Sequence, residues 1–144
     1  MGRGGESEAK RAFSARWSPR TLDEARARAD RMGVRFNQLT ERYVREGVRM
    51  DEHPLIYFRE GAAGRRPTLI GTRLDVATVI STVRQNGNSV EEAADYLRLP
   101  VSHVEACVRY YLAYQDEIDA WIERDTAEAE AAEISWRKRR EIFA

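Results

Sequence analysis

Two histidines and one cysteine are the residues to test first for catalytic or metal-binding chemistry. His53 precedes a proline and His103 follows a serine, and no His-x₃-His or Glu-x-x-His pair supplies either with a second metal ligand. Cys107 lies on the apolar face of an expected helix, so we interpret it as a core residue, and one cysteine excludes an internal disulfide framework. No nucleophile has an adjacent base. The sequence therefore favours a binding protein over an enzyme, with no metal and no cofactor.

The charged residues point to one end of the chain as a binding region. Residues 1–50 contain 12 Lys and Arg against 7 Asp and Glu, a net of +5, whereas residues 51–144 contain 12 against 17, a net of −5. A basic segment favours binding to a polyanion such as nucleic acid. No apolar run approaches the roughly 20 residues of a membrane span, and no signal peptide is recognisable. We therefore expect a cytoplasmic protein that does not contact a membrane.

Residues 11–18 alternate in a way that predicts a short strand. Phe13, Ala15 and Trp17 would point to one side, and Ala12, Ser14 and Arg16 to the other. An isolated strand leaves its backbone hydrogen-bonding groups unpaired. We therefore expect two copies of the chain to pair their strands antiparallel in an intertwined homodimer.

Two helices should follow this strand. Ser18 and Pro19 are residues that start a helix, and Gly33 is placed to end it. A second apolar stripe predicts another helix to about Arg49. One strand and two helices make a small core, which again favours a second copy of the chain.

This segment, RAFSARWSPRTLDEARARADRMGVRFNQLTERYVREGV, resembles the ribbon-helix-helix DNA-binding domain of bacterial repressors and of many antitoxins, including those of the VapB type. The resemblance implies that the paired strands enter the major groove, with Arg16 as the main base-reading residue. It also implies a phosphate contact at the start of the second helix, although Arg35 stands where a Ser or Thr cap is common. The expected DNA-binding residues are Arg11, Ala12, Ser14, Arg16, Arg35 and Asn37. The alternative is that Arg11 and Arg16 are solvated charges on a dimerisation strand.

The middle of the chain predicts a β-hairpin followed by helices. Two short strands lie between residues 55 and 71. Asp75 caps a helix that buries Val76, Val79, Ile80 and Val83 and stops near residues 86 and 87. Capping boxes begin at Ser89 and Ser102. The first predicts a short helix that buries Ala93, Tyr96 and Leu97, and the second a long helix whose buried residues are Val104, Val108, Tyr111, Ile118 and Ile122.

The stretch PTLIGTRLDV and the following SVEEAADYLRLP resemble the family called domain of unknown function 433, over roughly residues 53–122. Members often occur as antitoxins beside a toxin with a PIN-type nuclease fold. We interpret residues 61–66 as a hairpin turn rather than a phosphate cradle, and Arg73 as a structural arginine that satisfies a backbone group or a carboxylate. A second DNA-reading unit around Leu99 and Pro100 is disfavoured, because its exposed face would be acidic.

Residues 123–144 combine apolar and basic side chains in a way that predicts docking on a partner. Large apolar residues surround four consecutive cations. By the family resemblance, this tail would bind the toxin through Trp136, Arg137, Lys138, Arg139, Arg140, Ile142 and Phe143. The alternative is that the cations complement a helix C-terminus while the apolar residues pack on the chain's own middle domain.

The predicted fold class is mainly α. A disordered segment (1–10) precedes a ribbon-helix-helix domain (11–50), a helical domain with a leading β-hairpin (53–122) and a helical tail (123–144). The predicted function is that of an antitoxin, which neutralises a PIN-type ribonuclease toxin through its tail and represses its own promoter as a dimer or higher oligomer. The runner-up is a stand-alone ribbon-helix-helix transcriptional regulator. A nucleic-acid-processing enzyme is the third possibility.

Overall fold

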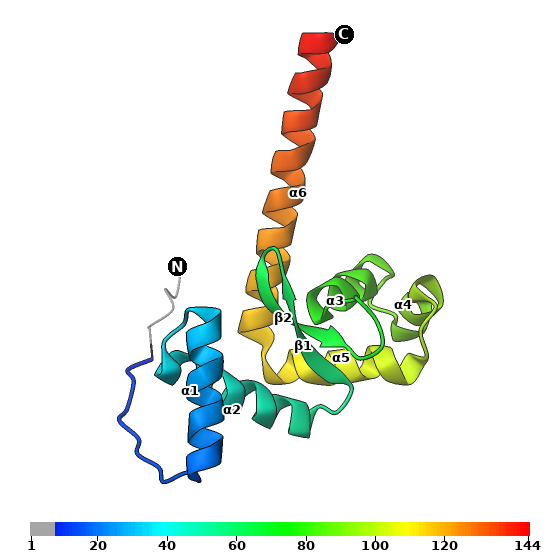
Figure 1. The fold of residues 1–144 in the computed structure, drawn as a ribbon. Coiled ribbons are helices and arrows are strands. Elements are labelled where there is room, and N and C mark those ends of the chain that lie inside the picture. The colour runs from blue at the N-terminus through cyan, green and yellow to red at the C-terminus, as the bar shows by residue number, and fades with distance from the viewer. Residues whose placement is uncertain (1–7) are drawn as a thin grey trace. The chain divides into compact units, whose positions relative to one another are not determined.

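The structure, a computed structural model, describes residues 8–144, which form six helices and one two-stranded sheet (Figure 1). The prediction of a mainly helical protein with a hairpin in the middle is confirmed. Of the segment predicted to be disordered, residues 1–7 lie outside the described residues, and residues 8–10 have no regular secondary structure. None of the helices that the structure describes has the length and apolar character needed to cross a membrane.

The chain divides into two compact units, Met1–Val44 and Arg45–Ala144. The division falls inside helix α2 (Phe36–Glu52), whereas the sequence-based boundary follows residue 50. It falls there because the second half of α2 has its ion pairs within the second unit: Glu46 pairs with Arg65, and Arg49 with Glu117.

In the first unit, local capping explains where the helices begin and end. Helix α1 (Pro19–Met32) starts after Ser18, whose Oγ accepts a hydrogen bond from the amide of Thr21 at 3.3 Å. It ends at Gly33, whose φ of 66° is the left-handed conformation that glycine adopts without strain. Ala29 of α1 and Leu39 of α2 are each 1% exposed and form the small core. The start and stop that we predicted for α1 are confirmed.

The strand predicted at residues 11–18 is not present. These residues have no regular secondary structure, and the Phe13 side chain is 88% exposed. A ribbon strand obtains its ladder hydrogen bonds from a second chain, and a single chain offers no such partner. The ribbon-helix-helix part of the fold prediction is therefore not confirmed.

The second unit surrounds one apolar core with a hairpin and four helices. Strands β1 (Ile56–Gly61) and β2 (Gly64–Leu69) pair antiparallel through a two-residue turn, as predicted for residues 61–66. Asp75 caps α3 (Val76–Gln85) and Ser89 caps α4 (Val90–Leu97), both as predicted. Helices α5 (Val101–Ala113) and α6 (Gln115–Phe143) complete the unit. The fully buried side chains of this core include Ile56, Leu69, Val76, Val79, Val104, Cys107, Tyr110 and Ile118.

Three local predictions for this unit are wrong. Pro100 occupies the N-cap of α5, so Ser102 lies inside the helix and makes no cap. The long helix predicted from Ser102 is broken at Tyr114, whose φ of −133° and ψ of 45° separate α5 from α6. Tyr96 is 72% exposed rather than buried, because α4 turns Ala93 and Ala94 to the core.

Candidate functional site

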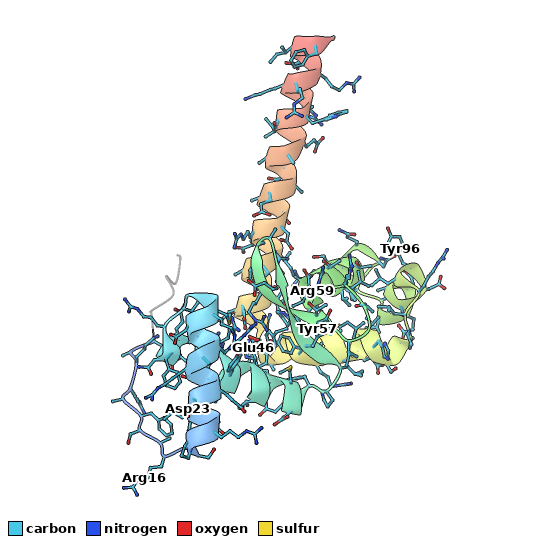
Figure 2. All side chains as sticks on the ribbon, viewed as in Figure 1. Arg16, Asp23, Glu46, Tyr57, Arg59 and Tyr96 are labelled. Carbon is cyan, nitrogen blue, oxygen red and sulfur yellow. The ribbon has the colours of Figure 1, made fainter. Side chains whose placement is uncertain are left out.

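The predicted DNA-binding residues are all exposed to solvent. Arg11, Ala12, Ser14 and Arg16 lie on the segment before α1, and Arg35 and Asn37 lie at the start of α2 (Figure 2 labels Arg16). The guanidinium groups of Arg11, Arg16 and Arg35 make no hydrogen bond or ion pair with the residues that the structure describes. These cations are therefore available to an anionic partner.

An apolar cleft accompanies these cations in the first unit. Phe13, Ala15, Trp17, Leu22 and Phe36 line it, together with the polar residues Asn37 and Thr40. The rings of Trp17 and Phe36 lie 6.1 Å apart and are tilted by 59°. Trp17 remains 40% exposed and Phe13 88% exposed, so apolar surface remains uncovered in the single chain.

Helix α2 also carries apolar side chains that the single chain leaves uncovered. Tyr43, Val44 and Val48 are 43%, 61% and 50% exposed. They recur at i, i+1 and i+5, which places them along one side of the helix. Exposed apolar side chains of this kind are ones that a second protein chain could bury.

The tail predicted to bind a partner is the outer part of α6. The helix packs on the core through Ile118, which is buried, and through Trp121 and Ile122, which are partly buried. Every residue from 126 to 144 is exposed, and we call this stretch the exposed tail. Trp136 is 55% exposed, Ile142 73% and Phe143 82%. The alternative, in which these apolar residues pack on the chain's own middle domain, is thus not met in the single chain.

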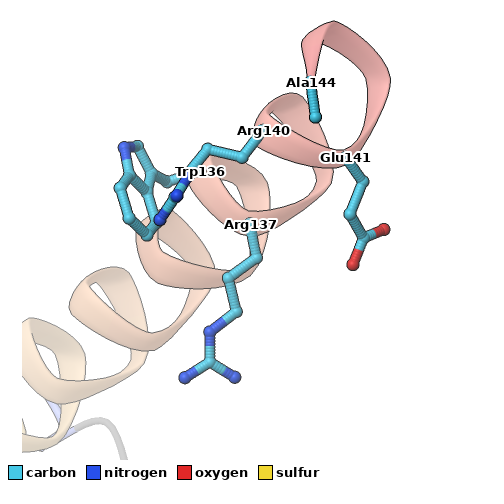
Figure 3. Close-up of a pocket in the computed structure, with 5 residues that line it drawn as sticks. All are labelled: Trp136, Arg137, Arg140, Glu141 and Ala144. Atoms are coloured by element: carbon cyan, nitrogen blue, oxygen red, sulfur yellow. The ribbon is translucent and has the colours of Figure 1, made fainter.

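Figure 3 draws five residues of the exposed tail, among which Trp136, Arg137 and Glu141 point away from the helix in different directions. Because successive residues of an α-helix are rotated by about 100°, the four cations Arg137–Arg140 project in four different directions. Trp136 and Phe143, seven residues apart, share one side of the helix, and Ile134 and Ile142 lie on another. The Arg140 guanidinium stacks 4.8 Å from the Trp136 ring centre, and Arg137 pairs with Glu133. The tail therefore presents both apolar groups and positive charge on more than one side.

A cluster of arginines in the second unit was not predicted from the sequence. Arg59 of β1 and Arg66 of β2 are directly opposite each other in the hairpin. Together with Arg73 and the turn at residues 61–64 they line a cleft of about 270 Å³. Arg66 donates to Asp125 at 2.6 and 2.8 Å and to Asp75 at 3.0 Å, and hydrogen bonding to Asp125 raises its pKa. The strand register creates this cluster, and the sequence of residues 56–61, IYFREG, does not alternate and gave no signal for it.

Two buried groups that could have been reactive are held in their neutral forms. Burial raises the pKa of the Cys107 thiol to about 12, which leaves it protonated and unreactive near neutral pH. Burial also raises the pKa of Tyr110 to about 12, against the opposing effect of Arg49, which donates a hydrogen bond to its hydroxyl. Within residues 8–144, no three His, Cys, Asp or Glu side chains are grouped closely enough to hold a metal ion.

Comparison with known proteins assigns neither a family nor a function to the chain. The chain matches no family model, no curated protein and no solved structure.

Proposed function

We propose that the chain is the antitoxin of a toxin-antitoxin pair. In this proposal its exposed tail binds and neutralises a PIN-type ribonuclease, and its first unit dimerises to bind operator DNA. The observation that carries the proposal is the exposed tail, which keeps Trp136, Ile142 and Phe143 largely in water at the end of an otherwise well-packed unit.

The exposure of the tail favours a partner over self-packing. Large apolar side chains in water are unfavourable by about 25 cal/mol for each Å² of apolar surface. In the single chain the apolar side chains of the tail stay exposed, which weighs against the alternative that the tail packs on its own middle domain. The neighbouring cations Arg137–Arg140 would complement an acidic partner surface, and a nuclease site that holds divalent metal is built from carboxylates. Trp136 and Phe143 would act as aromatic anchors in apolar pockets.

The first unit supports the DNA-binding half of the proposal. Arg11, Arg16 and Arg35 are exposed cations without partners among the described residues. The uncovered apolar cleft near Phe13 and the exposed apolar side chains of α2 favour pairing with a second copy of the chain. In that dimer the segments 11–18 would acquire their missing strand partners, and the resulting ribbon would place Arg16 in the major groove.

The test is to isolate the tagged full chain from its source cells and identify what co-purifies. We expect a small protein whose metal-dependent ribonuclease activity appears after separation and is suppressed when the chain is added back. A version ending at Asp125 and the double variant Trp136→Ala/Phe143→Ala should lose this protein. Ser135→Ala on the same helix is the matched control and should retain it.

The runner-up, a stand-alone regulator, predicts a different result. In that case no ribonuclease would co-purify with any version, while the full chain and the truncated version would bind promoter DNA equally well. That outcome would overturn the toxin-binding half of the proposal and leave the DNA-binding half standing.

A further inference from the structure

The face of the hairpin that carries Arg59 and Arg66 concentrates positive charge. The two residues are directly opposite across the strands, an arrangement that is unfavourable for like charges unless they are compensated. Arg66 is compensated, because it pairs with Asp75 and Asp125 and lies 4.1 Å from the Trp121 ring centre. Arg59, which Figure 2 labels on β1, has no ion pair or hydrogen bond with a described residue.

A third arginine reaches the same cleft from a tightly held loop. The Tyr57 hydroxyl donates to the carbonyl of Thr72 at 3.0 Å. The Thr72 hydroxyl donates to the carbonyl of Leu69 at 2.8 Å and accepts from the amide of Leu74 at 3.0 Å. These bonds fix the backbone on both sides of Arg73, yet its side chain is exposed and also lacks a partner among the described residues. The expectation that Arg73 satisfies a backbone group or a carboxylate is therefore wrong.

We propose that this cleft is a phosphate-binding site in which Arg59 and Arg73 hold the oxygen atoms of a phosphate group. Guanidinium groups are well suited to phosphate because their planar donors can form paired hydrogen bonds to its oxygens. Arg66, held by its two carboxylates, forms a fixed part of the wall. The three arginines carry three positive charges, and Asp75 and Asp125 carry two negative charges. The site therefore has one net positive charge, which a singly charged phosphodiester would balance.

The cleft has room for the group to which the phosphate is attached. Its turn side consists of Gly61, Ala62, Ala63 and Gly64, whose side chains are absent or small, and its volume of about 270 Å³ exceeds that of a phosphate group. The site shares no residue with the predicted DNA-binding segment or with the exposed tail. It therefore stands or falls independently of the proposed function. The phosphate could belong to a nucleic-acid backbone or to a nucleotide, and the test separates these sources.

The experiment is a residue-resolved NMR titration of the ¹⁵N-labelled full chain at constant ionic strength. The probes are inorganic phosphate, adenosine monophosphate and a short single-stranded oligonucleotide. We expect saturable shifts of the amides of Gly61, Gly64, Thr72 and Arg73. Arg59→Ala and Arg73→Ala should each weaken binding at this site at least tenfold, and Arg73→Lys less. Arg109→Ala, which removes an exposed cation from α5, is the control and should bind like the wild type.

The outcomes separate the sources of phosphate and can overturn the proposal. Saturation at this site by adenosine monophosphate but not by the oligonucleotide would assign it to a nucleotide, and tighter binding of the oligonucleotide would assign it to a nucleic-acid backbone. Shifts that do not saturate, or an unchanged affinity in a folded Arg73→Ala variant, would overturn the site. So would a tetraglutamate peptide that binds there more tightly than every phosphate probe.

Discussion

Arg16 and Cys107 represent the two kinds of residue on which function and stability depend in this protein. Arg16 is exposed on a segment without regular secondary structure and has no partner among the described residues, so its loss should affect binding rather than folding. Cys107 is fully buried in the core of the second unit, so we expect the ionisation of its thiol to change the free energy of unfolding rather than binding.

Arg16→Ala should weaken binding to the chain's own promoter by about 1–3 kcal/mol and relax the sequence preference at the position it reads. The reason is that, in the proposed DNA complex, a bidentate arginine contact to guanine would be lost while the dimer contacts would remain. Fluorescence anisotropy with a labelled promoter fragment measures the affinity, and ultracentrifugation checks the dimer. Arg109→Ala is the charge-matched control. An Arg16→Ala protein that bound the promoter as tightly as the wild type would rule out the ribbon arrangement.

The free energy of unfolding should fall as the pH rises from about 9 towards 12. Burial raises the pKa of Cys107 from 9.0 to about 12, so the folded state holds a proton that the unfolded state releases. Stability from this group is therefore complete below the unfolded pKa and is lost as the pH approaches the folded one. Urea unfolding of Cys107→Ala should show a shallower decline over this range, with the remainder due partly to Tyr110. If the free energy of unfolding fell equally steeply with pH in the wild type and in Cys107→Ala, the raised pKa of Cys107 would be contradicted.

At the scale of elements, ion pairs between distant segments hold the hairpin and the helices of the second unit together. Glu46 of α2, 6% exposed, accepts hydrogen bonds from Arg65 of β2 at 2.5 to 3.0 Å. Arg49 of α2 donates to Glu117 of α6 at 2.7 Å and to Tyr110 of α5 at 3.1 Å. The ion pairs that the exposed tail makes with described residues, in contrast, lie within its own helix.

Glu46→Ala should lower the free energy of unfolding of the second unit by about 1.5–3 kcal/mol, because it removes charged hydrogen bonds and leaves Arg65 without its best partner. Thermal and urea unfolding followed by circular dichroism measure the change. The control is Glu105→Ala, which removes an exposed carboxylate from α5 and should change stability by less than about 0.5 kcal/mol. A similar small effect for Glu46→Ala would show that this ion pair does not hold α2 to the hairpin.

Trp136→Ala/Phe143→Ala should leave the free energy of unfolding within about 0.5 kcal/mol of the wild type, because these side chains are exposed and bury little surface in the single chain. Urea unfolding gives the free energy. Hydrogen exchange adds a second readout, since amides in the exposed tail should exchange much faster than those near Ile118. A clear loss of stability would instead mean that the tail packs on its own chain, which is the alternative interpretation of the tail from the sequence.

At the scale of the whole molecule, the single chain leaves several apolar surfaces uncovered. They lie at Phe13 and Trp17, along α2 at Val44 and Val48, and in the exposed tail. Scattered exposed apolar residues are normal, but these occur on the elements for which we propose partners. In our proposal, a second copy of the chain would cover the first two surfaces, and the ribonuclease would cover the third.

Phe13→Asp should abolish dimerisation and promoter binding together, because in the proposed ribbon dimer Phe13 lies on the buried side and a charge there would remain unpaired in the interface. Light scattering coupled to gel filtration measures the mass, and anisotropy measures DNA binding. Ser14→Asp is less informative for the dimer, since that side chain would face the groove. If the Phe13→Asp protein were a monomer and still bound the promoter, the second unit rather than the first would be the DNA-binding part.

The features that the sequence determined by itself are local ones. The caps at Ser18, Asp75 and Ser89 and the stop at Gly33 depend on groups three or four residues apart, so the residue types alone indicate them. The periodicity of α3 also predicted its buried face correctly. The local rules failed where two signals competed, as at Pro100 and Ser102, and where the chain turns at Tyr114 to continue around the core.

Tertiary structure alone decided which distant residues meet. Arg66 reaches Asp125 across 59 positions and Arg49 reaches Glu117 across 68, and no periodicity encodes such pairs. The same holds for the cleft that joins Arg59 to Arg73, which depends on the hairpin register and on the loop bonded to Tyr57. The predicted DNA-binding and tail residues are exposed. Contacts within the chain therefore do not bring their side chains together into a site. In our proposal their arrangement depends on partner chains, because a second surface would supply the strand hydrogen bonds of the ribbon and bury the apolar side chains.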